Sequence, residues 1–245
     1  MADLKQAYRD LVIANRVLAH QNVVDAYGHV SMRHPEKPDH FLLSRSRSPE
    51  LVSEADIMEF TLDGKVVGDD KRPPYLERFI HGSLYEARSD VHSVVHSHAE
   101  ETLPFGITGV PLKPVIHVAG SMGAEVPVWD IAEKFGDNTN LLVTNVDQGR
   151  DLAQRIGQGR VALMRGHGFA AVGASVHDVV RLSVYLPVNA RIVTTALRLA
   201  PTYKPLAAGE IDSRWMQNPR APETWRAWEY WARRAGVSDL LAAGP

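Results

Sequence analysis

Cysteine is absent from this sequence of 245 residues. Without it the chain can form no disulfide, and no thiolate is available as a metal ligand. This absence leaves the redox compartment open, but any metal site has to be built from histidine, aspartate and glutamate. The sequence offers 11 histidines and 29 acidic residues for that purpose.

An excess of charge of either sign is also lacking. The 27 lysines and arginines nearly balance the 29 acidic residues, and the formal net charge is -2. No long block of like charge occurs along the chain. Such a sequence has no general attraction to nucleic acid or to an anionic membrane surface, so we expect a small molecule as its partner.

Long apolar runs are missing as well. The first residues carry charges at Asp3, Lys5 and Arg9, so they form neither the apolar core of a signal peptide nor a membrane span, and we expect a cytoplasmic protein. No repeat, low-complexity tract or strong linker divides the chain, and 44% hydrophobic residues suffice for a sizeable core. We expect a single domain over residues 1–245, with a Trp-rich helical tail from about residue 205.

The sequence does contain alternating helix and strand patterns. Apolar residues at three- and four-residue steps predict helices over residues 4–18 and 73–88, the second opened by two prolines. Ser175 and Asp178 form a capping pair before a third helix, 176–199, and the Asp63-Gly64 dipeptide favours a type I′ hairpin turn. Strand-like runs cover residues 29–34, 40–44, 56–61, 65–68, 91–98, 141–144, 161–168 and 169–173. These patterns predict an α/β fold whose central, mainly antiparallel sheet is flanked by helices.

Three histidines form a candidate metal site. His96 and His98 lie two residues apart in an expected strand, so their side chains leave the same face of the sheet. His167 lies between Gly166 and Gly168 just after another apolar strand, where missing side chains allow a close approach. Three neutral imidazoles leave a further coordination position open, as in a catalytic metal site. Each motif taken alone is also compatible with an ordinary strand or turn.

Four motifs follow one another along the chain: "GHVSMR" with Gly28 and Ser31, "ERFIHGSLY" with Glu77, "VVHSHAE", and "LMRGHGFAAVG". In this order they resemble the class II aldolase/adducin family. The similarity runs from about residue 4 to about residue 200. The resemblance implies an αβα layered fold, a divalent metal held by His96, His98 and His167, and Glu77 as the acid/base carboxylate. It also implies a homotetramer whose active sites lie between subunits.

The sequence departs from the sugar-phosphate aldolases of that family where they hold phosphate. His29, the "SRSRS" segment and Pro73-Pro74 replace the residues expected there. Arg45 and Arg47 stand in this region, and their guanidinium groups suit carboxylates as well as phosphates. The alternative is that both arginines pair with surface acids such as Glu50.

With these departures the chain resembles a subgroup that decarboxylates hydroxylated aromatic or hydroxypyridine dicarboxylates. An ortho-hydroxy acid can chelate one metal ion, which then stabilises the charge that develops as carbon dioxide leaves. We expect Arg45, Arg47, His29 and Ser31 to bind a carboxylate substrate. Zn²⁺ or Mn²⁺ is the expected ion, with Fe²⁺ and Co²⁺ as alternatives.

Two further histidines are candidate catalytic residues. His81 follows Glu77 by four residues, so on one helix it would either orient that carboxylate, carry a proton or pack against the sheet. By the resemblance, His117 lies in a stretch that reaches the neighbouring subunit's site. Three functions stay open: a metal-dependent decarboxylase, an aldolase or epimerase of a hydroxy-keto compound, and a non-catalytic module like the adducin head.

Overall fold

The structure of this chain is a computed structural model that describes residues 3–212 and 221–244. A seven-stranded sheet forms its centre, with the strand order β3-β2-β1-β4-β7-β6-β5. Every neighbouring pair is antiparallel except β5 and β6. The strands are β1 His29–Arg33, β2 His40–Ser44, β3 Ile57–Thr61, β4 Ser93–Ser97, β5 Val128–Trp129, β6 Val161–Met164 and β7 Gly168–Gly173.

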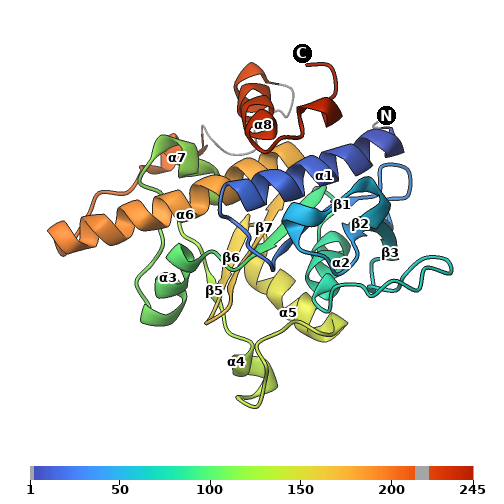
Figure 1. The fold of residues 1–245 in the computed structure, drawn as a ribbon. Helices are drawn as coiled ribbons and strands as arrows, with labels where there is room; N and C mark the ends of the chain where they lie inside the picture. Colours follow the sequence, from blue (N-terminus) through green and yellow to red (C-terminus); the bar gives the residue numbers. More distant parts are fainter. Residues whose placement is uncertain (1–2, 213–220, 245) are drawn as a thin grey trace.

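Helices cover both faces of this sheet (Figure 1). One face packs against α1 Leu4–His20 and α6 Val176–Leu199, and α8 Pro222–Arg234 lies on the outer side of these two helices. The apolar cluster on this side includes Leu11, Val179 and Trp228. The opposite face packs against α2 Arg78–Ala87 and α5 Val146–Ile156, with Ile80 and Leu152 in a second apolar cluster. Two cores separated by one sheet make three layers, which confirms the expected α/β fold with a mainly antiparallel sheet.

Shorter elements connect these layers. The short helices are α3 Leu103–Thr108, α4 Ala132–Phe135 and α7 Ala208–Asp212, and the 3₁₀ turns are η1 Pro49–Leu51, η2 Glu54–Asp56, η3 Glu100–Thr102, η4 His117–Met122 and η5 Ser238–Leu240. Within residues 3–212 and 221–244, no helix has both the length and the apolar character needed to cross a membrane. Residues 213–220 of the Trp-rich tail lie outside the described part of the chain.

Several elements confirm the sequence patterns. Helix α1 begins at Leu4, and α6 begins at Val176 where the Ser175 hydroxyl accepts a hydrogen bond from the Asp178 amide. Strands β1 and β2 pair as a hairpin. The Trp-rich tail contains the helix α8, in which Trp228 is 2% exposed and belongs to the apolar cluster of Leu11 and Val179.

Other predictions are wrong at the level of backbone geometry. Residues 141–144 form no strand, because Leu141 adopts a left-handed conformation with φ +65°. Gly64 has φ +80° but Asp63 does not share a positive φ, so the turn is not type I′. The second run of that hairpin makes only a single bridge, Val66 to Phe60.

The second helix begins five residues later than its prolines suggested. Pro74 pairs with Arg45 in an isolated β-bridge, and α2 starts at Arg78 with Glu77 as its N-cap. Residues 73–75 therefore lie beside the end of β2, and Leu76 and Glu77 form a turn that leads into α2. This offset places Glu77 at a helix end and on the sheet side of the molecule, where it can meet side chains from β4.

Candidate metal centre

Four side chains from separate elements meet at one end of the central strands. Ligand atoms of Glu77, His96, His98 and His167 all lie within 4.8 Å of one another. His96 belongs to β4, His98 follows the end of that strand, and His167 lies in the turn between β6 and β7. The three histidines of the sequence motifs are thus brought together with the expected carboxylate.

A close approach of two backbones creates this convergence. A Cβ atom on Gly168 would lie 2.0 Å from the carbonyl oxygen of Ser97, so any side chain there would push the two segments apart. Because Gly168 has none, the turn that carries His167 can lie against the Ser97-His98 segment. Gly166, with φ +66°, supplies the left-handed conformation that the same turn requires.

The imidazole nitrogens have the spacing expected of ligands to a single ion. The Nε2 atoms of His96 and His98 are 3.0 Å apart, and those of His98 and His167 are also 3.0 Å apart. Nitrogens bound to one Zn²⁺ at about 2.1 Å lie about 3.0 to 3.4 Å from each other for angles of about 90 to 110°. His96 Nδ1 donates to the carbonyl oxygen of Phe169 at 3.1 Å, which leaves the lone pair of its Nε2 free for a metal. These residues therefore fit a divalent cation.

Electrostatics favour the forms that coordination requires. Burial, followed by the nearby His96 and His167, lowers the pKa of His98 to about 4, so its imidazole is neutral at physiological pH. Burial raises the pKa of Glu77, but His96 and His167 outweigh this and hold it well below its usual range. Glu77 is therefore a carboxylate, with Oε2 at 3.4 Å from His96 Nε2 and 3.5 Å from His167 Nε2.

The second oxygen of Glu77 is fixed by a segment that sequence reasoning misread as a strand. Oε1 accepts a hydrogen bond of 3.0 Å from the backbone amide of Val143. The irregular backbone around Leu141 leaves this amide free to point at the carboxylate. Apolar composition alone cannot distinguish such a segment from a strand, so no pattern in the sequence indicates this contact.

His29, His81, Ser31 and Tyr85 form a buried hydrogen-bonded chain beside the cluster. His29 Nδ1 is 2.6 Å from His81 Nε2, His81 Nδ1 is 2.6 Å from Ser31 Oγ, and Ser31 Oγ is 2.7 Å from Tyr85 Oη. The His29 ring centroid lies 5.1 Å from that of His96. His81 bonds to this chain and makes no hydrogen bond to Glu77, so of the three roles that the sequence left open, orienting that carboxylate does not apply. Ser31 is fully buried with both partners in the chain, so it meets side chains and not the substrate space.

Arg45 and Arg47 are both held by one carboxylate. Asp56 accepts from Arg45 Nε at 2.6 Å and lies 3.5 Å from Arg47 Nε. The partner is thus Asp56, and not the surface acid Glu50 that the alternative named. Since Arg45 engages Asp56 through Nε, its two terminal nitrogens keep their hydrogens available for an anion.

Tyr75 is a site residue that sequence reasoning missed. Its ring centroid lies 4.6 Å from that of His29, and its hydroxyl donates to the backbone carbonyl of Arg47. It therefore connects the arginine segment to the histidine chain. Its place directly after Pro73-Pro74 and two residues before Glu77 was the available signal.

His117 is not a member of this cluster. It is exposed at the start of η4. Its expected role at a neighbouring subunit's site stays a prediction.

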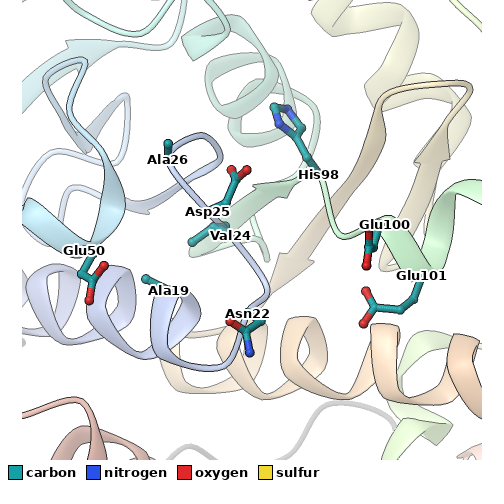
Figure 2. Close-up of a pocket in the computed structure, with 9 residues that line it drawn as sticks. All are labelled: Ala19, Asn22, Val24, Asp25, Ala26, Glu50, His98, Glu100 and Glu101. Atoms are coloured by element: carbon teal, nitrogen blue, oxygen red, sulfur yellow. The ribbon is translucent and has the colours of Figure 1, made fainter.

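A cavity of about 740 Å³ opens beside His98. Figure 2 shows its lining, to which Asp25, Glu50, Glu100 and Glu101 contribute carboxylates. His98 is the one member of the four-residue cluster on this wall. An anionic substrate would meet like charge along this side of the centre.

The three-layer fold and the histidine-carboxylate cluster together define a candidate metalloenzyme. More specifically, the chain belongs to the class II aldolase/adducin family: residues 9–194 match the "Class II Aldolase and Adducin N-terminal domain". The family resemblance of the sequence motifs is thereby confirmed.

Relatives within this family are named as decarboxylases. The chain is 36% identical to "Decarboxylase tropJ" of Talaromyces stipitatus, over 95% of both chains. It is 28% identical to "3,4-dihydroxyphthalate decarboxylase" of Arthrobacter keyseri, over 69% of this chain and 70% of that protein. The family and these relatives make the chain an enzyme of the carbon-carbon lyase class.

Solved structures share the fold. The L-fuculose 1-phosphate aldolase from Glaciozyma antarctica matches with a TM-score of 0.73 and 20% identity, over 98% of this chain and 90% of its own. An aldolase II superfamily protein from Pseudomonas syringae matches with a TM-score of 0.79 and 20% identity, over 97% and 95% of the two chains. At this identity the likeness establishes the fold alone.

Proposed function

We propose that this chain is a metal-dependent decarboxylase of a hydroxylated aromatic or heteroaromatic carboxylate. The observation that carries the proposal is the convergence of three imidazole Nε2 atoms beside the Glu77 carboxylate. The names of the relatives support the reaction, since both a fungal and a bacterial relative are called decarboxylases. The substrate class follows from the chelating chemistry of an ortho-hydroxy acid and from the bacterial relative's name.

His96, His98 and His167 would hold the divalent ion, for which we propose Zn²⁺ or Mn²⁺, with Fe²⁺ and Co²⁺ as alternatives. When bound, this ion supplies a Lewis acid for the electron pair that remains after the carbon-carbon bond breaks. Glu77 takes the proton of the substrate hydroxyl and returns it to the ring carbon that has lost carbon dioxide. Its position, fixed by the Val143 amide, keeps one oxygen toward the histidines for this transfer.

The side of the centre that bears His29, Tyr75, Arg45 and Arg47 would bind the substrate. The cavity beside His98 is lined by carboxylates that repel an anion. The Arg45 guanidinium, held at Nε by Asp56, can offer its two terminal nitrogens to a carboxylate. An anionic ring would therefore turn its carboxylate toward Arg45 and away from the cavity beside His98.

We also propose a cytoplasmic homotetramer with active sites between subunits, where His117 would act on a neighbour's site. Family relatives of this type support an oligomer acting on small molecules. Sedimentation velocity tests the assembly: a single monomeric species at micromolar concentration would contradict it.

Carbon dioxide release tests the function. The metal-reconstituted protein is incubated with a panel of ortho-hydroxy aromatic and pyridine mono- and dicarboxylates, with an EDTA-treated sample as control. Release from one member, lost with EDTA and restored by metal, is the expected result. No release from any member by a protein with stoichiometric metal would overturn decarboxylation and leave retro-aldol cleavage as the reaction to assay.

A further inference from the structure

The four-residue chain next to the metal centre has one sense of proton donation. Tyr85 is 1% exposed, and among the described residues its hydroxyl has one side-chain partner, Ser31 Oγ. A buried phenol needs an acceptor for its proton, so Tyr85 donates to Ser31. The reverse sense would leave that proton without an acceptor in the core.

This first donation fixes every later one. Ser31 has a single hydroxyl proton, and with Tyr85 already donating to its oxygen, that proton goes to His81 Nδ1. A neutral His81 that accepts at Nδ1 carries its proton on Nε2, from which it donates to His29 Nδ1. His29 must then carry its own proton on Nε2. All four groups are neutral, and each of Tyr85, Ser31 and His81 donates its one proton to the next member of the chain.

The free end of the chain reaches the site. Strand register pairs His29 with His96, so both side chains leave the same face of the sheet. His29 Nε2 has no hydrogen-bond partner among the described residues. Unlike His167 Nδ1, which also lacks a partner, it is not fully buried. Solvent therefore reaches Nε2, next to a proposed metal ligand and to Tyr75.

We infer that His81 is a positioning residue that, through the chain anchored at Tyr85, fixes His29 as an Nε2–H donor to the substrate's oxygen atoms. This inference rests on the proposed function for the identity of the acceptor, a carboxylate or hydroxyl oxygen. It reassigns His81: its imidazole has both nitrogens engaged within the core and touches no reacting atom. It also gives Ser31 and Tyr85 a shared task, since they set the direction of the chain.

Nitrogen-15 NMR of the Zn²⁺-loaded protein, with labelled histidine, reads this tautomer directly. The His29 signals are assigned by their loss in His29→Gln. The expected wild-type result is a protonated Nε2 and an unprotonated Nδ1 on His29. His81→Gln retains an amide N–H that can donate to His29 Nδ1 and should keep that tautomer, whereas His81→Leu should give a mixture of both.

Kinetics add a second readout, with a matched control. His81→Leu should raise KM about tenfold, the effect of one lost substrate hydrogen bond, with a smaller change in kcat, and His81→Gln should stay within about twofold of wild type. Ser93→Ala removes another buried serine hydroxyl, one that donates to the Ser31 carbonyl and lies outside the chain, and should change neither the tautomer nor KM.

A wild-type His29 protonated on Nδ1 would overturn the inference, and so would equal effects of His81→Gln and His81→Leu. The tautomer is measured without any substrate turnover, so its result does not depend on whether the proposed function is correct. If no carbon dioxide is released but Nε2 carries the proton, the decarboxylase proposal fails while the chain's direction stands.

Discussion

His96 and His167 reach the centre from different segments of the chain. Removing either side chain leaves two of the three imidazoles. We expect His96→Ala and His167→Ala each to lose stoichiometric metal binding and to reduce activity by at least about 100-fold, because the residues that bind the ion directly supply most of the metal-binding energy. Metal content by mass spectrometry and far-UV circular dichroism check this. His92→Ala, an exposed histidine shortly before β4, is the control. Full metal content in either ligand variant would reject the site.

Glu77 has two oxygens with different partners, which allows a sharper substitution. Glu77→Gln keeps an oxygen for the Val143 amide but removes the negative charge and the ability to take a proton. We expect a fold close to wild type and a kcat lower by about 10² to 10⁴, the usual contribution of general acid-base catalysis. Steady-state kinetics measure it, and a kcat within about twofold of wild type would remove Glu77 from the chemistry.

Asp56 shows how a supporting residue carries a pH dependence. Burial raises the pKa of Asp56, but hydrogen bonds from Ser53 and Arg45 outweigh this and lower it to about 2. The folded-state pKa therefore lies below the unfolded value of about 3.9, so Asp56 contributes stability above pH about 4 that is lost as pH falls toward 2.

Asp56→Asn should accordingly reduce the free energy of unfolding by about 2 kcal/mol at pH 7. The difference from wild type should shrink between pH 4 and the lowest pH at which both remain folded. Urea unfolding at several pH values measures this. Glu50→Gln is the matched control, since Glu50 is exposed, and a pH-independent difference for Asp56→Asn would refute the linkage.

Among the elements, the turn between β6 and β7 decides whether the cluster exists. Gly168→Ala puts a Cβ against the Ser97 carbonyl, so the turn must move away and carry His167 with it. We expect a loss of at least about 2 kcal/mol in the free energy of unfolding, together with weaker metal binding. Gly209→Ala, with nothing near the added Cβ, serves as control in denaturation and metal titration. Equal behaviour of the two variants would contradict this account.

The sequence was most informative for elements with strong periodicity. The α1 pattern, the Ser175 cap of α6 and the β1-β2 hairpin were predicted because local spacing and capping determine them. Residues 141–144 and the start of α2 were not, because tertiary contacts set them: the Val143 amide serves Glu77, and Pro74 bridges to Arg45. Local propensity carries no information about such long-range partners.

The candidate site divides in the same way. Short sequence motifs contain all four residues of the cluster, His96, His98, His167 and Glu77, so they could be predicted. Tyr75 and Asp56 act through contacts with residues 46 and 11 positions away, respectively, and have no motif. His81 was singled out by its spacing from Glu77, yet its partners come from β1, because Glu77 ends up as an N-cap outside the helix.

For the molecule as a whole, a bound ion should couple to folding. The proposed ligands come from β4, the segment after it, the β6-β7 turn and the start of α2, so an ion held by them would bind the folded state only. At a free metal concentration of about 100 times Kd, metal binding should raise the free energy of unfolding by about 2.7 kcal/mol, which raises Tm by roughly 5 to 10 °C. Differential scanning fluorimetry with and without Zn²⁺ measures the shift. His98→Ala should show almost none; an equal rise there would indicate binding elsewhere.

The order of strands in the sheet has a practical consequence for redesign. The imidazole ligands come from β4, its following residue and the β6-β7 turn, in the interior of the sheet, whereas Arg45, Asp56 and Tyr75 stand at the β2-β3 margin. The proposed substrate-binding residues of this margin thus lie apart from the proposed metal ligands, with His29 of β1 between the two groups. A protein engineer who wishes to change the accepted acid would therefore vary residues 45–51 and 72–76, and would keep Asp56 and the four residues of the cluster unchanged.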